Sequence, residues 1–255
     1  MTTTVNVKGS DTMVTLAQRW AEAFTAATPH TSVQVSGGGS GTGIVALING
    51  TTDVCQASRR MNDKERLALR ARTGSDPIEL VVARDGLAIY VNTANPVDEI
   101  STTQLKDIYT GKLTNWRELG GPEATIIAYA RENSSGTYVF FKEHLLDGAD
   151  LAAGTQMIPG TAGVVNAVAH ERGAIGFGGA AYAVGVKKLK VRRGAEGPAV
   201  SIDLSTIQSG QYPLARPLFF YLAKPATGKV KAFVDFASSK RGQAIVSGVG
   251  YFPVK

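Results

Sequence analysis

The chain has 255 residues, of which 44% are hydrophobic and 19% are charged. This balance is typical of a folded α/β protein and excludes an intrinsically disordered chain. The longest apolar runs fall far below the roughly 18 residues that a membrane span needs, so we expect no transmembrane helix. The single cysteine, Cys55, excludes a disulfide framework and a cysteine-based metal site, and its apolar neighbour Val54 predicts a buried thiol.

The formal net charge of +6 favours an anionic partner. The basic residues are nevertheless scattered, and their one cluster, Lys187 to Arg193, has no aromatic platform or reading helix beside it. We therefore expect no nucleic-acid partner. The opening MTTTVNV lacks the basic and apolar stretches of an export signal, so we expect any such signal to be absent from this sequence.

Hydrophobic periodicity predicts repeated strand–helix units in the first third of the chain. Each predicted strand runs into a loop of small residues, and a helix starts in or after that loop. Such repeats indicate a mostly parallel sheet. The predicted strands lie at 5–7, 32–35 and 53–57, and the predicted helices lie at 13–24, 44–48 and 63–72.

The middle of the chain begins a second unit with the same strand–helix pattern. If the apolar runs around Arg84 and the strand around Tyr221 both cross between the units, the chain forms a two-lobed clamshell with its ligand in the cleft. The prediction is lobe I at 1–84 plus 223–255, lobe II at 85–222, and hinges near 82–88 and 218–223. Further strands are predicted at 78–82, 87–91, 126–129, 174–177, 186–191 and 218–223, and further helices at 101–109, 138–146, 164–169, 230–237 and 242–246.

Four loops of small and hydroxyl-bearing residues carry the chemistry: GSDTM from Gly9, GGGSGTG from Gly37, TTDVCQAS from Thr51 and ARENSSGT from Ala130. Helix N-termini offer unpaired N–H groups and a positive dipole end, so several together predict an oxyanion site. Arg131 adds a planar guanidinium suited to tetrahedral oxyanions, although each loop alone is more often a plain helix cap and a lone arginine is more often part of a surface ion pair. The candidate hydroxyl donors are Ser10, Thr12, Ser40, Ser135 and Thr137.

Asp53 is the unusual member of these loops. A carboxylate beside a bound anion repels it, unless the anion carries a hydrogen that the carboxylate can accept. Hydrogen phosphate has such a hydrogen and sulfate has none, so Asp53 predicts discrimination between the two. A simple turn aspartate explains the same residue equally well.

The four loops resemble those of PstS-type phosphate-binding proteins, the extracytoplasmic receptors of phosphate ABC importers. The resemblance extends to segments without a ligand role and covers nearly the whole chain in the expected order. These segments are DGLAIYVNTANPV from Asp85, LKDIYTGKLTNW from Leu105, ERGAIGFGG from Glu171 and YPLARPLFFY from Tyr212.

The resemblance implies a type II periplasmic-binding-protein fold, with two α/β lobes of mostly parallel sheet closing on phosphate. It implies no enzymatic activity, catalytic residue, cofactor or metal, a membrane permease as partner, and a monomer in the periplasm or another extracytoplasmic space, with or without a lipid anchor. By position it implies phosphate contacts from Ser10, Thr12, the N–H of Met13, Ser40, Asp53, Arg131, Ser135, Gly136 and Thr137.

Two positions depart from the family pattern. Met13 replaces an aromatic residue of some relatives, and Asn133 replaces an aspartate that pairs with the arginine, so we expect Arg131 to be held less firmly. Glu132 and Arg59 are candidates for altering the rim. We otherwise interpret Arg59 and Arg60 as structural or rim charges.

Several other functions remain to be weighed. A receptor for sulfate, arsenate or molybdate fits the same loops, although Asp53 disfavours fully ionised anions. A nucleotide-dependent oxidoreductase is suggested by Gly41, Gly43 and Ala46, which spell the dinucleotide fingerprint, but the expected ribose-binding acid is missing downstream. A serine hydrolase lacks the GxSxG elbow around Ser40, and no metal motif is present.

Overall fold

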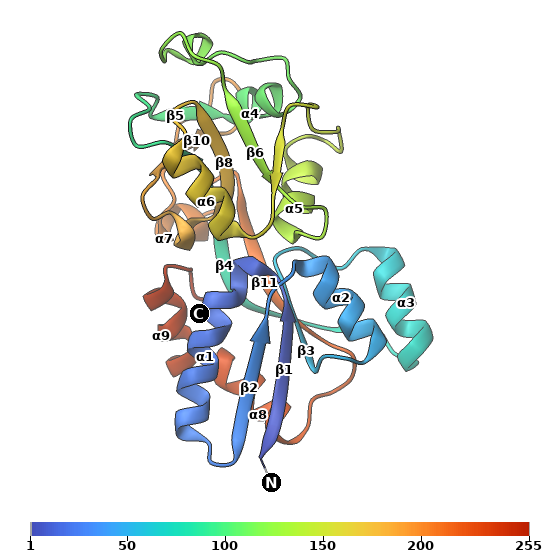
Figure 1. Ribbon diagram of the computed structural model, residues 1–255. Helices are drawn as coiled ribbons and strands as arrows, with labels where there is room; N and C mark the ends of the chain where they lie inside the picture. The colour runs from blue at the N-terminus through green and yellow to red at the C-terminus, as the bar shows by residue number, and fades with distance from the viewer. Residues whose placement is uncertain (1, 255) are drawn as a thin grey trace. The chain divides into compact units, whose positions relative to one another are not determined.

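A computed structural model describes residues 2–254 of the chain (Figure 1). The chain divides into two compact units. Unit 1 comprises Met1–Arg84, Ser134–Gly136 and Pro217–Lys255, and unit 2 comprises Asp85–Asn133 and Thr137–Arg216. The short segment Ser134–Gly136 therefore belongs with unit 1, although its neighbours in sequence belong to unit 2. The predicted hinges concern movement of the units, and both the hinges and the predicted lobe boundaries stay predictions.

Unit 1 is built on parallel strands that follow the predicted repeats. Strands β1 (Thr3–Gly9), β2 (Thr31–Ser36) and β3 (Val54–Ala57) pair in the order β2-β1-β3, and β11 (Ala215–Leu222) pairs antiparallel with β3. The helices of the unit are α1 (Val14–Ala27), α2 (Ser40–Asn49), α3 (Asp63–Thr73), α8 (Gly228–Ser238) and α9 (Lys240–Val249), and the 3₁₀ helix η1 (Asp11–Met13) precedes α1.

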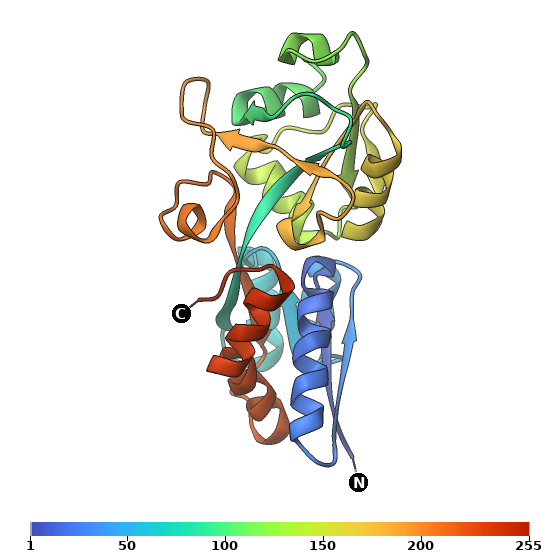
Figure 2. The same ribbon diagram turned by 90° about the vertical axis from the view of Figure 1, so that its left-hand side faces the viewer.

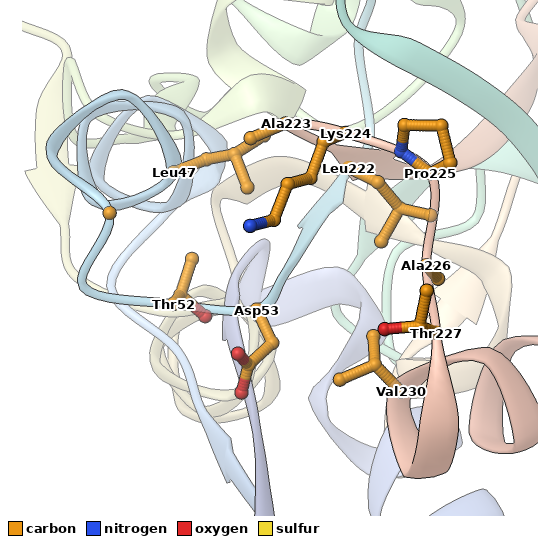
Figure 3. A pocket seen from close by; sticks show the side chains of 11 residues that line it. Leu47, Thr52, Asp53, Leu222, Ala223, Lys224, Pro225, Ala226, Thr227 and Val230 are labelled. Atoms are coloured by element: carbon orange, nitrogen blue, oxygen red, sulfur yellow. The ribbon is translucent and has the colours of Figure 1, made fainter. Parts of the chain in front are cut away.

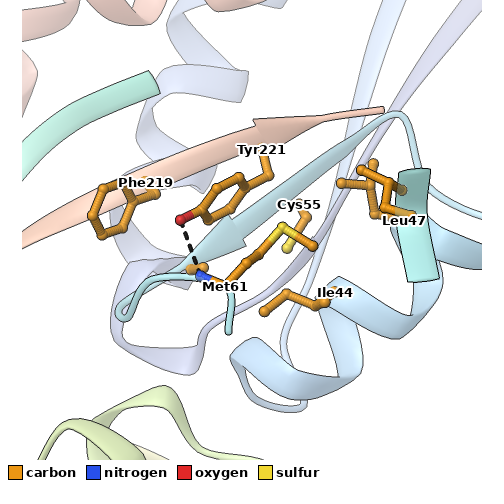
Figure 4. Close-up of a cluster of buried hydrophobic side chains, with 8 residues drawn as sticks. Ile44, Leu47, Cys55, Met61, Phe219 and Tyr221 are labelled. Carbon is orange, nitrogen blue, oxygen red and sulfur yellow. Dashed lines mark hydrogen bonds between the residues drawn. The ribbon is translucent and has the colours of Figure 1, made fainter. Parts of the chain in front are cut away.

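Alternating side chains of β11 show that both faces of this sheet are covered, since successive strand residues point to opposite faces. Phe219 and Tyr221 pack with Cys55 against α2 and α3, and the Tyr221 hydroxyl accepts a hydrogen bond from Met61 N at 3.1 Å (Figure 4). Phe220 packs in the opposite direction, with its ring centroid 5.4 Å from that of Trp20 on α1. Helices α1, α8 and α9 contact one another on that side (Figure 2).

The prediction that Cys55 is a buried structural thiol is confirmed, because its side chain is fully buried. Burial raises the pKa of the thiol well above its ordinary value. The thiol is therefore neutral and unreactive at physiological pH.

Unit 2 has a mixed sheet. The long strand β4 (Ile78–Val91) pairs antiparallel with β8 (Ala174–Gly179), which pairs parallel with β6 (Ile127–Arg131), and β6 pairs parallel with β7 (Gln156–Ile158). β9 (Lys187–Lys188) pairs with β4, and β5 (Glu99–Ser101) pairs with β10 (Lys190–Arg192). The helices are α4 (Thr102–Tyr109), α5 (Gly136–His144), α6 (Thr161–His170) and α7 (Leu204–Gln208), with 3₁₀ helices η2 (Trp116–Leu119) and η3 (Ala180–Tyr182).

The predicted α/β class is confirmed, and some boundaries differ. The two apolar runs at 78–82 and 87–91 form one strand, β4, because the residues between them stay extended and Arg84 pairs with Phe252. The run at 186–191 is broken into β9 and β10, which pair with different strands. Across residues 2–254, no helix combines the length and the apolar character that a membrane crossing requires.

A buried ion pair joins β4 and β11 inside unit 2. Arg216 donates to Asp85 Oδ2 from Nε at 3.0 Å and from Nη2 at 2.8 Å, and both side chains are buried. Ala180 N donates to Asp85 Oδ1 at 3.3 Å. The guanidinium also lies 5.5 Å from the ring centroid of Phe140 on α5. Arg216 therefore connects the crossing strands to the body of the unit.

Removing one partner of this pair should be costly. Asp85→Ala leaves the Arg216 guanidinium buried without its carboxylate, and we expect the free energy of unfolding to fall by about 3 to 5 kcal/mol. Urea unfolding followed by circular dichroism measures this change. Glu22→Ala, which removes the partner of exposed Arg19, is the control and should have no measurable effect. Equal effects of the two substitutions would show that the buried pair is not stabilising.

Candidate functional site

The first loop begins where β1 ends, at a glycine that the structure requires. Gly9 has φ +144°, and a Cβ added there would lie 2.1 Å from the backbone O of Gln56. The next residue, Ser10, donates its N–H to that same oxygen at 2.8 Å. Ser10, Thr12 and Met13 are all buried, and the Met13 N–H donates to Ser10 O at 3.0 Å. The loop is thus a rigid turn bound to β3.

The second loop follows β2 and lies against the first. Gly39 has φ +92° and donates its N–H to Gly9 O at 3.0 Å, and Gly38 N donates to Asp11 Oδ1 at 2.9 Å. Helix α2 then begins at Ser40, with no side chain capping its first turn. A Cβ added at Gly43 would lie 2.6 Å from Gly9 Cα, so α2 approaches β1 more closely than a side chain would allow.

A cluster of three serine hydroxyls connects these loops to the end of β3. Ser10 Oγ donates to Ser58 Oγ at 3.0 Å, and Ser58 Oγ lies 3.3 Å from Ser40 Oγ. Ser58 N also donates to Ser40 Oγ at 3.0 Å, and all three side chains are buried. Ser58 was not among the predicted ligands. The signal that could have found it is its place directly after β3, at the same sheet edge as Ser10.

The segment Ser134–Gly136 of the fourth loop, which belongs to unit 1, packs onto this serine cluster. Gly41 N donates to Ser134 O at 3.0 Å. A Cβ added at Gly136 would lie 2.2 Å from Ser40 Oγ and 2.9 Å from Ser58 Oγ. The structure therefore brings Ser10, Ser40 and Gly136 together, as predicted. Ser135, which precedes Gly136 in sequence, is also buried.

Arg131 ends strand β6 in unit 2 and donates three hydrogen bonds to two neighbouring side chains. Its Nε and Nη2 donate to the two carboxylate oxygens of Glu132 at 2.9 and 2.8 Å, and its Nη1 donates to Thr161 Oγ1 at 2.7 Å. Its side chain is 1% exposed. The expectation that Asn133 leaves Arg131 loosely held is wrong, because Glu132 supplies the carboxylate that position 133 lacks. Thr137, also in unit 2, is buried in the first turn of α5.

The charge of Arg131 also acts on Glu132. Burial alone would raise the pKa of Glu132, but the hydrogen bonds and the charge of Arg131 lower it below its ordinary value. Glu132 is therefore ionised at neutral pH. The two side chains form a fixed, charge-balanced pair, with the arginine geometry set by a bidentate contact.

Asp53 lies elsewhere in unit 1. It precedes β3, whereas Ser58 follows that strand, so five residues of extended chain, roughly 16 Å, separate them. Its Oδ2 accepts hydrogen bonds from Asn6 N at 2.8 Å and from Asn6 Nδ2 at 3.3 Å. It lines a surface cavity of ≈ 390 Å³ together with Lys224 and Thr227 (Figure 3). The structure does not bring Asp53 together with the loops, and the predicted role as proton acceptor does not fit this position.

Unit 1 contains hydroxyl groups and a helix start that no side chain caps, and unit 2 contains the buried guanidinium of Arg131. Among residues 2–254, no group of three or more histidine, cysteine, aspartate and glutamate side chains is placed to hold a metal ion. The chemistry of the donors is that of reversible anion binding. The fold and the site thus define an α/β binding protein for a small anion.

Comparison with known proteins agrees with this class. A model of the PBP superfamily domain matches residues 2–241. The phosphate-binding protein PstS of Pseudomonas aeruginosa is 31% identical and is matched over 96% of this chain and 81% of its own length. The phosphate-binding protein PstS of Bacillus subtilis is 34% identical and is matched over 98% of this chain and 80% of its own length.

A solved structure from Clostridium perfringens, a putative phosphate ABC transporter substrate-binding protein with bound phosphate, is similar with a TM-score of 0.90 and 31% identity. The match covers 99% of this chain and 100% of that one. The chain is therefore a member of the PBP superfamily. Within it, the chain belongs to the family of PstS phosphate-binding proteins, which confirms the resemblance seen in its motifs.

The close approach at Gly9 can be tested by substitution. Gly9→Ala should lower the free energy of unfolding by about 3 kcal/mol or more, because it adds both backbone strain and a clash with Gln56 O. Gly50→Ala is the matched control, since Gly50 also has positive φ but has open space around its Cβ direction. It should cost about 1 kcal/mol. Equal losses in thermal or urea unfolding would contradict the steric account.

Proposed function

We propose that this protein binds inorganic phosphate and delivers it to the membrane permease of an ABC importer, catalysing no reaction itself. The observation that carries the proposal is the convergence of Ser10, Ser40, Ser58 and Gly136 at the start of α2. This convergence places hydroxyls and backbone amides at one end of the parallel strands of unit 1. Membership in the family of PstS proteins supports phosphate as the anion.

The proposed ligand set follows from burial and donor chemistry. Hydroxyl groups donate to the phosphate oxygens, and the α2 and α5 N-termini favour its negative charge. Arg131 supplies the planar donor fork, pre-oriented by Glu132 and Thr161. We retain Met13 as a neighbour of the ligand, with its N–H already donated to Ser10 O. The set is Ser10, Thr12, Met13, Ser40, Arg131, Ser135, Gly136 and Thr137.

Delivery requires that bound and free forms differ. Strands β4 and β11 both run from one unit into the other, and two-strand crossings of this kind permit hinge closure around a ligand. We propose that phosphate closes the two units and that the permease recognises the closed form. The protein then acts as a monomer outside the cytoplasmic membrane, in a periplasmic or other extracytoplasmic space, without a nucleic-acid partner.

Arg131 is the first residue to test. Arg131→Ala should weaken phosphate binding by about 2 to 5 kcal/mol, because a buried guanidinium partner of the anion is removed. Isothermal titration calorimetry on protein unfolded and refolded without phosphate measures this directly. Arg117→Ala is the control, because Arg117 pairs with Glu123 on the exposed surface of the same unit. Unchanged affinity in the Arg131 variant would remove this residue from the site.

Asp53 provides a second test, in which we expect phosphate binding to stay unchanged. Its position at the far end of β3 predicts that Asp53→Asn leaves phosphate affinity within about twofold of the parent and leaves the response to sulfate unchanged. Calorimetric titrations with both anions test this. A variant that gains sulfate binding would restore Asp53 as the residue that senses the ligand proton.

A further inference from the structure

Arg59 comes directly after Ser58 in sequence and belongs to unit 1. Its side chain is 10% exposed, and its Nη2 lies 3.8 Å from the position that a Cβ on Gly41 would take. Ser134 O lies 3.3 Å from that same position. The guanidinium therefore adjoins the point where the first turn of α2 meets the fourth loop. This point belongs to the proposed phosphate site, so Arg59 lies closer to the ligand than a rim charge would.

Glu65 on α3 fixes this arginine. Arg59 Nη1 donates to Glu65 Oε2 at 2.7 Å, and Nη2 donates to Glu65 Oε1 at 2.7 Å. Arg59 Nη1 also donates to Arg60 O at 2.9 Å. A bidentate contact holds the fork in one plane, so the cation keeps its place beside α2.

The next residue, Arg60, shows that this placement is particular to Arg59. The Arg60 side chain is 65% exposed and forms an ion pair with Glu79. Its guanidinium stacks over Phe219 at 5.3 Å, on the side of the sheet that carries α3. Two adjacent arginines thus have separate environments, and only the first adjoins the loops.

The carboxylates near the loops all accept hydrogen bonds from the protein. Asp11 accepts from Gly38 N, Glu65 from Arg59 and Glu132 from Arg131. With Asp53 at the far end of β3, the anion meets chiefly N–H and O–H donors and positive charge. A second positive charge beside the ligand favours its more highly charged form.

We propose that Arg59 is a specificity-determining residue of the anion site, supplying a second positive charge at the start of α2 that Glu65 moderates and that favours dianionic over monoanionic phosphate. This inference rests on the proposed function. Glu65 on α3 and Cys55 on β3 are titratable groups near Arg59, whereas α2 and the segment Ser134–Gly136 contain none. Because the buried Cys55 thiol is neutral, it adds nothing to the pH response near neutrality, where phosphate itself changes its charge.

The test uses three single variants, Arg59→Gln, Glu65→Gln and Arg60→Gln, titrated with phosphate by calorimetry at pH 6 and pH 8. Loss of the Arg59 charge should weaken phosphate binding at least about tenfold and reduce the gain in affinity from pH 6 to pH 8. Loss of the Glu65 charge should strengthen binding by about threefold, since Arg59 then acts unopposed. The matched control Arg60→Gln should stay within about twofold of the parent.

The sign of the Glu65 effect distinguishes charge from structure. If the pair serves only to hold the loop, both of its variants weaken binding alike, and the inference is overturned. Unchanged affinity in Arg59→Gln overturns it as well. Glutamine at position 65 retains an acceptor for Asn62 N, and urea unfolding of each variant verifies that the fold is kept.

A sulfate titration separates this inference from the proposed function. A parent protein that binds sulfate and not phosphate at either pH would refute the proposed function. Opposite effects of the Arg59 and Glu65 variants on that sulfate binding would still support a charge role for Arg59. A parent that binds phosphate more tightly at pH 6 than at pH 8 would refute the preference for the dianion and leave the proposed function standing.

Discussion

The close backbone approach of α2 to β1 is the constraint on which the site of unit 1 depends. A Cβ at Gly43 would lie 2.6 Å from Gly9 Cα, and a Cβ at Gly9 would lie 2.1 Å from Gln56 O, so neither position tolerates a side chain. That approach brings Ser40 to the end of β3, where its hydroxyl accepts from Ser58 N. The glycines therefore let a helix N-terminus lie at the strand ends, where its positive dipole end favours an anion.

Much of this site could be predicted from sequence because its parts are local. Glycine-rich turns between a strand and a helix indicate where a helix begins, and the parallel repeats indicate that several such turns share one sheet edge. Ser10 and Ser40 were found in this way, Gly136 came from the family resemblance, and the three residues do lie together. The same reasoning missed Ser58 as a member of the serine cluster, because its place after β3 is typical of an ordinary turn residue as well.

Asp53 and Glu132 show where local reasoning fails. Asp53 shares a short stretch with Ser58, but the strand between them is extended and carries the two residues to opposite ends. Sequence proximity therefore predicted the wrong end of β3. Glu132 was treated as a rim residue because the family pattern places the partner of the arginine at position 133. The carboxylate at 132 reaches Arg131 in a bidentate contact, which depends on side-chain length and backbone direction and leaves no sequence motif.

The two arginines of the proposed site share one electrostatic arrangement. Arg131 in unit 2 and Arg59 in unit 1 are each held by a bidentate carboxylate, Glu132 and Glu65 respectively. Burying an unpaired guanidinium is costly, and a carboxylate partner offsets that cost in the ligand-free protein. The partner also reduces the net attraction for the ligand, so the site must gain its remaining affinity from neutral donors. This explains why hydroxyls and helix amides, and few unpaired charges, make up the four loops.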